Sequence, residues 1–437
     1  MSKVQHHVPD EETLERDDLL ALQRRKLRAM LARVRVDNAF YRAKFAGIEF
    51  DPMCDPIEAL PFTTRAEIEQ DQAAHPPYGS NLTQPLAAYV RLHQTSGSSG
   101  GRPVRWLDTE ANWQWWKRLW GIIYRAAGVT QQDRIFFPFS FGPFVGFWAA
   151  FEGAVAMGNL SLSAGGMTTP ARLRFMCDNG CTVVCCTPTY ALRMAEVAEQ
   201  EGIDLAACPV RKLIVAGEPG GSIPETRRRI EEAWGARVYD HTGMTEIGAL
   251  GFECDQAPGG VHLVESECIA EVIDPATGRS VADGAEGELV LTNLGRVDSP
   301  LIRYRTNDHV RVTRRRCACG RSFARMEGGI LGRIDDMMVV RGNNVFPASL
   351  EAIIRRFPAV REFRVEVCGD PAPTRLRVDV EPADGAEPQQ LARDVARAIH
   401  DALNFRAEVT AVAAGTLPRF EMKAHRFVRA KPAPVGA

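Results

Sequence analysis

The sequence lacks the features that mark membrane, secreted and nucleic-acid-binding proteins. No run approaches the about 18 apolar residues of a membrane span, and the polar N-terminal segment has no apolar core typical of a secretory signal. The net charge is −2, from 53 basic and 55 acidic residues, so no excess of positive charge favours nucleic acid. The cysteines number 11, which is odd, and several lie in apolar runs, a pattern that favours reduced thiols over disulfides. We therefore expect a cytoplasmic protein that binds neither membranes nor nucleic acid.

What the sequence does contain is typical of an α/β protein. Its 437 residues, 45% hydrophobic and 25% charged, suggest two or three domains of about 150 residues. Between residues 134 and 240, short apolar runs alternate with helical patterns, which predicts a parallel sheet covered on both faces. Shorter β-like runs at 261–313 predict a small antiparallel part. We expect a large N-terminal domain (1–334) and a small, mobile α+β C-terminal domain (335–437).

A glycine- and hydroxyl-rich stretch at 95–103 follows the apolar segment 86–92. Glycine lets backbone N–H groups turn toward an anion, and hydroxyls add donors, so this loop is a candidate phosphate site. The G-x-x-x-x-G-K-[ST] spacing is absent, and a flexible surface loop has the same composition. The candidate ligands are Thr95, Ser96, Gly97, Ser98, Ser99 and Gly100.

Seven short segments follow one another in order: 95–103, 217–219, 240–246, 303–308, 331–337, 341–347 and 417–424. Together they resemble the motifs of the phenylacetate–CoA ligase branch of the adenylate-forming enzymes, over nearly everything from Thr95 to Lys423. The resemblance implies that a carboxylic acid attacks the α-phosphate of ATP, which releases pyrophosphate. The acyl-adenylate would then pass its acyl group to coenzyme A and release AMP.

The resemblance also implies roles for single residues. Lys423 is expected to bridge the carboxylate and the α-phosphate, although a solvated lysine in a basic tail is the plainer interpretation. Glu246, which follows Thr245, is expected to hold Mg²⁺. Asp308 is expected to bind the ribose hydroxyls and Arg333 the ribose or a phosphate. The alternatives are a helix-start glutamate, a turn aspartate and a surface arginine.

Further positions complete the predicted site. Asp335 is expected to be the hinge about which the small domain rotates, and Gly342 to lie on the coenzyme A side. The adenine-side residues are Gly217, Glu218, Pro219, Asp240, His241 and Thr242. Thr242 stands where the common pattern has an aromatic residue, so His241 or Tyr239 is a candidate replacement. Phe420 and Met422 flank the lysine where relatives have small residues, and Gly101 shifts the basic residue of the phosphate loop.

The run 136–144 contains five phenylalanines and resembles the segment that lines the aryl pocket of these ligases. A flat apolar pocket suits an aromatic ring, while packing into the core is the alternative. Benzoate, an aminobenzoate such as anthranilate, or phenylacetate is the expected acid. The predicted pocket residues are Phe139, Phe141, Gly142, Phe144 and Ala216.

A second cluster has metal-ligand chemistry: Cys254, His262, Cys317 and Cys319. Some relatives carry zinc at what look like these positions, so we expect a structural Zn²⁺, with free thiols in a turn as the alternative. The family and a tryptophan-rich helix at 109–127 suggest a homodimer. Other acceptors for the acyl group remain open, a carrier-protein phosphopantetheine or an amine. So does a different class, a non-catalytic nucleotide- or acid-binding protein.

Overall fold

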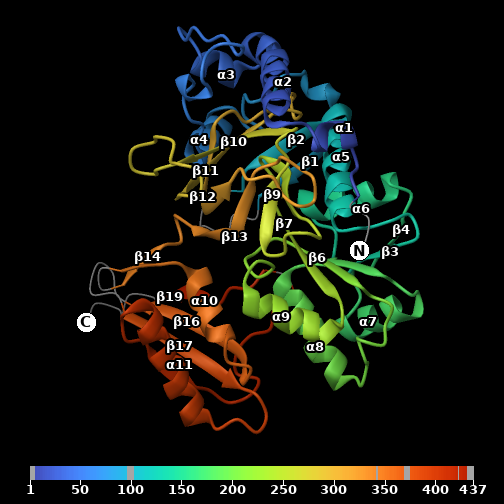
Figure 1. Cartoon of the computed structure of the whole chain (residues 1–437), viewed down its shortest axis with the longest axis vertical. Coiled ribbons are helices and arrows are strands. Elements are labelled where there is room, and N and C mark those ends of the chain that lie inside the picture. The colour runs from blue at the N-terminus through green and yellow to red at the C-terminus, as the bar shows by residue number, and fades with distance from the viewer. Residues whose placement is uncertain (1–4, 96–102, 341–342, 369–374, 422, 431–437) are drawn as a thin grey trace.

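The computed structural model describes residues 5–95, 103–340, 343–368, 375–421 and 423–430. Residues up to 333 form a large lobe and residues 338–430 form a small lobe, coloured orange to red in Figure 1. The α/β fold class predicted from the sequence is confirmed. The large lobe ends with β13 (Arg325–Arg333), directly before the predicted hinge at Asp335.

One eleven-stranded sheet organises the large lobe, in the order β10-β11-β12-β13-β9-β8-β7-β6-β5-β3-β4. The parallel half comprises β3 (Arg134–Phe137), β4 (Leu160–Ser163), β5 (Val183–Cys186), β6 (Lys212–Val215) and β7 (Arg237–Met244). The antiparallel half comprises β8 (Gly248–Glu253), β9 (Gly260–Leu263), β10 (Cys268–Ile273), β11 (Glu286–Asn293), β12 (Tyr304–Thr313) and β13. Because β7 pairs with both β6 and β8, the predicted antiparallel part continues the parallel sheet.

Helices bury both faces of the parallel half. Alternate residues such as Phe137, Ile214 and Tyr239 belong to the apolar cluster with α5 (Glu110–Ala126) and α6 (Val145–Ala156). Their neighbours Phe136 and Val238 belong to the cluster with α7 (Thr169–Asp178), α8 (Pro188–Gln200) and α9 (Pro224–Trp234). Burial on two faces explains why these strands are continuous apolar runs.

Helices and a hairpin precede this sheet. The helices are α1 (Pro9–Glu12), α2 (Arg16–Asp37), α3 (Ala39–Lys44), η1 (Ile57–Ala59), α4 (Arg65–Ala74) and η2 (Leu86–Ala88). Thr64 caps α4 in a capping box with Glu67, as the sequence predicts. The hairpin of β1 (Tyr89–Gln94) and β2 (Arg105–Thr109) leads into and out of the glycine-rich loop.

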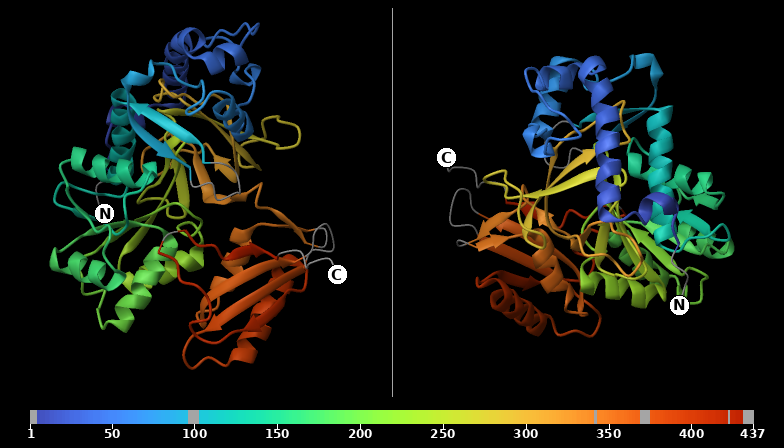
Figure 2. Two further views of the ribbon diagram at one scale, coloured as in Figure 1. Left: turned by 180° about the vertical axis from the view of Figure 1, so that it is seen from behind. Right: turned by 45° about the horizontal axis from the view of Figure 1, so that its top comes forward.

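The small lobe has its own apolar core, made of residues from Met338 onward. It contains the β14 (Met338–Val340) and β15 (Asn343–Val345) hairpin, α10 (Pro347–Arg355) and α11 (Pro388–Leu403). Its sheet has the order β18-β17-β16-β19, with β16 (Val360–Cys368), β17 (Arg375–Pro382), β18 (Glu408–Ala411) and β19 (Phe427–Arg429). The lobe lies beside α9 and β13, as Figure 2 shows from two further directions.

One argument for the expected homodimer is removed, and the expectation of reduced thiols is corrected at one pair of cysteines. The side chains of Trp113, Trp115, Trp116 and Trp120 are buried in the core of the chain itself, because α5 packs on the sheet and on α6. They therefore offer no surface to a second copy. Cys177 and Cys208 form a disulfide, since the end of α7 and the segment before β6 approach to a Cα–Cα distance of 5.7 Å.

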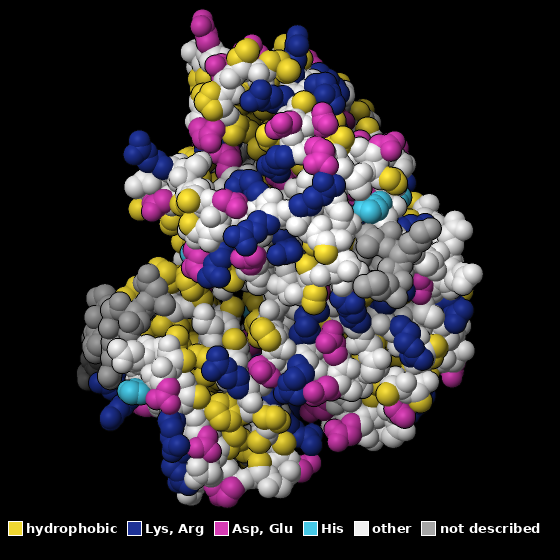
Figure 3. Space-filling model, viewed as in Figure 1, with side chains coloured by type: hydrophobic (Ala, Val, Ile, Leu, Met, Phe, Trp, Pro, Cys, Tyr) yellow, Lys and Arg dark blue, Asp and Glu magenta, His cyan; other side chains and the backbone are white. Residues whose placement is uncertain are grey.

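In the part of the chain that the structure describes, no helix has the length and apolar character to cross a membrane. On the face shown in Figure 3, basic and acidic side chains are interspersed over both lobes, which accords with the nearly balanced charge of the chain.

Candidate active site

The base of the glycine-rich loop is closed by Thr95. Its backbone N–H donates to Val104 O (3.0 Å), and its hydroxyl accepts from the Val104 N–H (3.0 Å). Arg65 at the start of α4 donates to the same hydroxyl (3.3 Å). The predicted phosphate ligands Ser96, Gly97, Ser98, Ser99 and Gly100 lie outside the described residues, as does Gly342. Thr95 is thus joined both to Val104 and to Arg65.

Thr245 and Glu246 lie in the turn that follows β7, and a buried arginine fixes their backbone. Arg296 donates to Thr245 O (2.6 Å) and Glu246 O (3.1 Å), while its other two nitrogens bind both oxygens of Asp108 at 2.7 Å. The Glu246 carboxylate accepts from Tyr304 Oη (3.4 Å) and lies 3.6 Å from Arg65 Nη1. A carboxylate oxygen is a suitable Mg²⁺ ligand, and Arg65 contacts both Glu246 and Thr95.

Asp308 and Arg333 face each other across β12 and β13, where they are register partners. Arg333 Nη1 lies 3.4 Å from Asp308 Oδ1, and the same guanidinium pairs with Asp335 at 2.8 Å. Burial raises the pKa of Asp308 to about 7, although Arg333 acts in the opposite direction. The carboxylate is therefore poised for a partner that donates hydrogen bonds.

Lys423 reaches this group from the small lobe. A Cβ on Gly217 would lie 3.3 Å from Lys423 Cε, and Gly217 has φ +97°, so this close approach requires glycine. Lys423 keeps exposed surface, yet the protein around its ammonium lowers the pKa, while Glu218, Glu246 and Asp308 oppose that decrease. The fold thus brings Lys423 close enough to the carboxylates of Glu246 and Asp308 for their charges to act on it.

Glu218, predicted on the adenine side, joins the two lobes. Its carboxylate accepts from the backbone N–H of Thr189 (2.9 Å) and of Ala424 (2.7 Å). Burial raises the pKa of Glu218. Pro219 follows as an exposed residue. Glu218 therefore fixes the residue next to the lysine.

Asp240 and His241 lie on opposite faces of β7. Asp240 accepts from Ser222 Oγ, and burial raises its pKa to about 7. His241 is buried against Trp120, with ring centroids 4.7 Å apart, and its Nδ1 is 2.5 Å from Gly251 O. Burial lowers the pKa of His241 to about 4, so the ring is neutral. Thr242 is half-buried on the Asp240 side of the strand, whereas the Tyr239 ring packs with His241 in the α5 core.

The phenylalanine-rich segment packs mainly on α6. Phe139 is 9% exposed and stacks on Phe147, with ring centroids 4.2 Å apart. Phe141 contacts Trp148 (4.9 Å), whose indole donates to Gly142 O at 2.9 Å. Phe144 and Ala216 are half-buried. Core packing accounts for Phe139, while Phe141, Phe144 and Ala216 keep surface that a ligand can contact.

Cys254, His262, Cys317 and Cys319 converge as the sequence suggests, with all four ligand atoms within 4.8 Å of one another. Cys254 Sγ lies 3.8 Å from Cys317 Sγ and 3.6 Å from His262 Nε2. Zn–S bonds of about 2.3 Å at tetrahedral angles place two sulfurs about 3.8 Å apart. His262 Nδ1 is 3.1 Å from Phe323 O, which leaves Nε2 free for a metal. The donor set fits a closed Zn²⁺ site.

Comparisons with known proteins agree with this geometry. The family model for AMP-binding enzymes matches residues 95–295, and that for the AMP-binding enzyme C-terminal domain matches residues 342–431. The phenylacetate-coenzyme A ligase of Pseudomonas putida is 30% identical over 94% of this chain and 94% of that protein. The chain belongs to the phenylacetate-CoA ligase family. The phenylacetate-coenzyme A ligase of Thermus thermophilus is 29% identical over 95% of this chain and 97% of that protein. The protein is thus an AMP-forming acid–thiol ligase.

Solved structures identify the arrangement of the lobes. A 2-hydroxyisobutyryl-CoA ligase in its postadenylation state gives a TM-score of 0.90, with 27% identity, and covers 97% of this chain and 92% of that chain. The same enzyme in its thioesterification state gives 0.72, with 28% identity, over 96% of this chain and 91% of that chain. Because the sequence is nearly equally similar in both cases, the difference reflects domain arrangement. The lobes of this ligase are arranged as in the postadenylation state.

Three site residues escaped sequence reasoning: Arg65, Arg296 and Tyr304. In the sequence, Arg65 is recognisable only as a residue at the start of a helix. The fold brings it into contact with Thr95 and Glu246, which are distant in the sequence. Arg296 is a fully buried cation that follows Gly295, and nothing local indicates its partner Asp108. Tyr304 lies in the segment 303–308, which the sequence indicates because of Asp308. Of the three residues, it is therefore the one that a local pattern could have indicated.

Proposed function

We propose that this ligase activates an aromatic carboxylic acid, a benzoate, an aminobenzoate or phenylacetate, and transfers the acyl group to coenzyme A. The observation that supports the proposal most directly is Lys423, held beside Glu246 and Asp308 by close contact with Gly217. The relatives named phenylacetate-coenzyme A ligase and the partly exposed Phe141 and Phe144 support an aryl acid.

In the first step a carboxylate oxygen attacks the α-phosphorus of ATP, and the bond to the pyrophosphate oxygen breaks. Lys423 would neutralise charge on the carboxylate and α-phosphate oxygens, an electrostatic role for a compact cation. Glu246 would hold Mg²⁺, which neutralises phosphate charge, and Arg65 lies where it adds a second positive charge. Asp308 would accept hydrogen bonds from the ribose hydroxyls, beside Arg333.

In the second step the thiol of coenzyme A, as the thiolate, attacks the acyl carbon, and AMP leaves with the electrons of the broken bond. The small lobe would rotate about Asp335, so that Lys423 withdraws and the side near Gly342 faces the adenylate. Asp240 and Thr242 would lie toward the adenine base of ATP. His241 contacts the core on the other side of β7, so we do not propose that it binds the nucleotide.

The test is acid-dependent pyrophosphate release with ATP and Mg²⁺, with and without free coenzyme A. The panel contains benzoate, anthranilate, phenylacetate and 2-hydroxyisobutyrate. We expect release with an aryl acid, acceleration by coenzyme A and a thioester product. Release with 2-hydroxyisobutyrate alone would contradict the aryl assignment, and release that coenzyme A does not accelerate would contradict free coenzyme A as the acceptor.

The Lys423→Ala variant should lose about 100-fold or more in adenylation rate, because electrostatic groups aimed at the reacting phosphate contribute on that scale. Lys212→Ala is the matched control, since that lysine pairs with Asp133 at the opposite end of the parallel strands. Full activity of Lys423→Ala would contradict the role of the lysine, whereas absence of adenylation in the unaltered protein with every acid would favour a binding protein.

We also propose that Cys254, His262, Cys317 and Cys319 hold a structural Zn²⁺. The sulfur separation and the fixed imidazole orientation support a tetrahedral ion. When bound, the ion would tie β8 and β9 to the segment between β12 and β13. Four protein ligands close the site, so it contributes stability, and no catalytic step involves it.

A further inference from the structure

The segment that carries Lys423 is attached to the large lobe by a second carboxylate, Glu421. Thr169 Oγ1 donates to Glu421 Oε1 (3.0 Å), and Arg172 Nη1 donates to Glu421 Oε2 (3.2 Å). Both donors lie in α7, while Glu421 lies two residues before the lysine. The Glu421 carboxylate of the small lobe therefore accepts hydrogen bonds from two side chains of the large lobe.

Thr169 and Arg172 form a binding site for the Glu421 carboxylate, the Thr169–Arg172 socket, whose side chains are held in place by other groups of the large lobe. Arg172 is 5% exposed, and its Nε donates to Ala164 O (3.1 Å). Its Nη1 also donates to Tyr190 Oη (2.6 Å), and that hydroxyl lies 3.1 Å from Thr169 Oγ1. The guanidinium is thus held by neutral groups of its own lobe, which orient it and leave its charge uncompensated.

Glu421 supplies the missing negative charge. Within the described parts of the chain, it is the one carboxylate in ion-pair contact with Arg172. A buried cation without a partner is costly, so the socket favours the lobe arrangement in which Glu421 occupies it. The side chain of Glu421 remains 56% exposed, which limits the strength of the pair.

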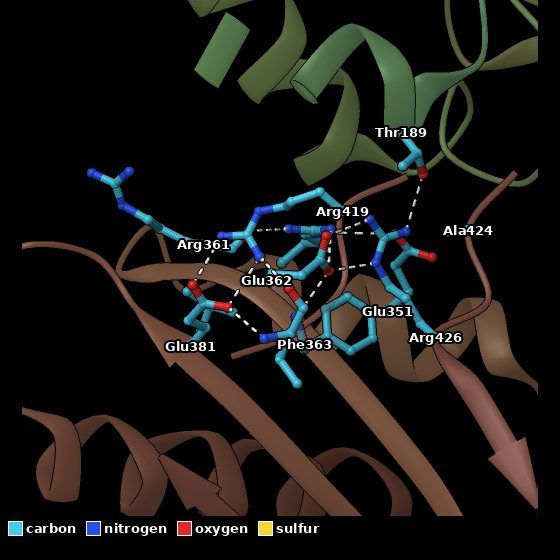
Figure 4. A network of polar contacts seen from close by, with 12 residues as sticks. Thr189, Glu351, Arg361, Glu362, Phe363, Glu381, Arg419, Ala424 and Arg426 are labelled. Carbon is cyan, nitrogen blue, oxygen red and sulfur yellow. Dashed lines mark hydrogen bonds and ion pairs between the residues drawn. The ribbon is translucent and has the colours of Figure 1, made fainter. Parts of the chain in front are cut away.

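A second attachment acts on the other side of the lysine. Glu218 accepts the backbone N–H of Ala424 (2.7 Å), and Arg426 donates to Thr189 Oγ1 (3.1 Å). Figure 4 shows Arg426 between Thr189 of α8 and Glu362 of the small lobe. Lys423 is therefore held from both directions along the chain, by Glu421 before it and Ala424 after it.

We propose that Glu421 is a positioning residue for adenylation, which acts by docking in the Thr169–Arg172 socket and so placing Lys423. The proposal rests on the function proposed for Lys423. Because the contact joins the two lobes, it has to break when the lobes rotate for thioester formation. Glu421 thus assists the first half-reaction and contributes nothing to the second.

The test separates the two half-reactions in Glu421→Gln and Glu421→Ala. Adenylation is followed as acid-dependent exchange between labelled pyrophosphate and ATP. Thioester formation is followed from preformed acyl-adenylate and coenzyme A. We expect a decrease of about 5- to 10-fold in the exchange rate, the effect of a half-exposed charge-assisted hydrogen bond. The thioester rate should stay within about twofold of the unaltered protein.

The matched control is Glu408→Gln. Glu408 is another carboxylate of the small lobe, 60% exposed, and it pairs with Arg377 of the same lobe. Thr169→Val removes one donor of the socket with little change in volume. Its effect on exchange should be non-additive with Glu421→Ala, because each of these two changes removes the hydrogen bond between Thr169 and Glu421.

Each outcome decides the proposal. Equal decreases in both half-reactions would show a merely structural role, and unchanged exchange in Glu421→Ala would show that docking is unimportant. Additive effects of Thr169→Val and Glu421→Ala would show that Thr169 and Glu421 act independently of each other. Absence of exchange in the unaltered protein would refute the proposed function itself, which is a different result from active protein with unaffected variants.

Discussion

The buried pair of Asp108 and Arg296 allows a sharp prediction about the turn that carries Thr245 and Glu246. Both side chains are fully buried, and two hydrogen bonds of 2.7 Å join them. Burial alone would raise the pKa of Asp108, but the charge of Arg296 outweighs it and holds that pKa below its ordinary value. Asp108→Asn keeps the volume of the side chain and leaves Arg296 as a buried cation without its counterion.

The expected loss follows from what Arg296 retains. Breaking a buried pair costs about 3–5 kcal/mol. Arg296 keeps its bonds to the carbonyl oxygens of Thr245 and Glu246 and its positions over the rings of Trp106 and Trp116. We therefore expect the lower value, about 3 kcal/mol. With an unfolding entropy of about 2.1 cal/mol/K per residue over roughly 334 residues, the melting temperature should fall by about 4 °C.

Differential scanning fluorimetry measures the shift, and Asp283→Asn is the control. Asp283 pairs with Arg314 on the surface, where both side chains are more than one third exposed, so its loss should cost under about 1 kcal/mol. The Mg²⁺ concentration for half-maximal adenylation should also rise in Asp108→Asn, because the Thr245–Glu246 turn loses part of its support. Equal melting temperatures for the two variants would refute the argument from buried charge.

Two further predictions concern the metal cluster and pH. The purified protein should contain about one Zn²⁺ per chain, and Cys319→Ser should lose the ion and more than about 3 kcal/mol of stability, as expected for removal of a bound metal. The exposed Cys54→Ser is the control, and equal zinc content in both variants would contradict the site. Burial raises the pKa of Asp308 to about 7. In the role proposed for it, Asp308 binds the ribose hydroxyls in its ionised form, so AMP binding should release a proton and tighten as pH rises from about 6 to 8. Calorimetry in buffers of different ionisation enthalpy measures that release, which Asp308→Asn should abolish; an unchanged release in that variant would assign the proton to another group.

Much of the fold could be predicted because the patterns that determine it are local. β3, β5 and β6 are buried on both faces, so each is a short apolar run that stands out in the sequence. The helix starts carry their own signals, as Thr64 and Thr109 show by accepting from backbone N–H groups of the first turn.

The residues that could not be predicted depend on contacts over long sequence distances. Arg296 and Asp108 are 188 positions apart, and Arg172 and Glu421 are 249 apart. The sequence shows only common charged residues at these positions, and folding gives them their roles. His241 is a different case, because adjacent strand residues point to opposite faces and Asp240 and His241 cannot both face one ligand.

The contacts between the lobes explain how one chain can be rigid enough for adenylation and still rearrange. The apolar core of the small lobe begins at Met338 and is separate from those of the large lobe. The Phe346 ring of the small lobe stacks on His309 of β12. Several further contacts that cross are polar, among them Glu421 with Arg172, Arg419 with Glu196, and Arg426 with Thr189. Water can replace such partners at modest cost, whereas exposing a shared apolar core would cost far more. A largely polar boundary would therefore let several weak bonds define the position of Lys423 together, while each would be easy to break in the proposed rotation of the lobes.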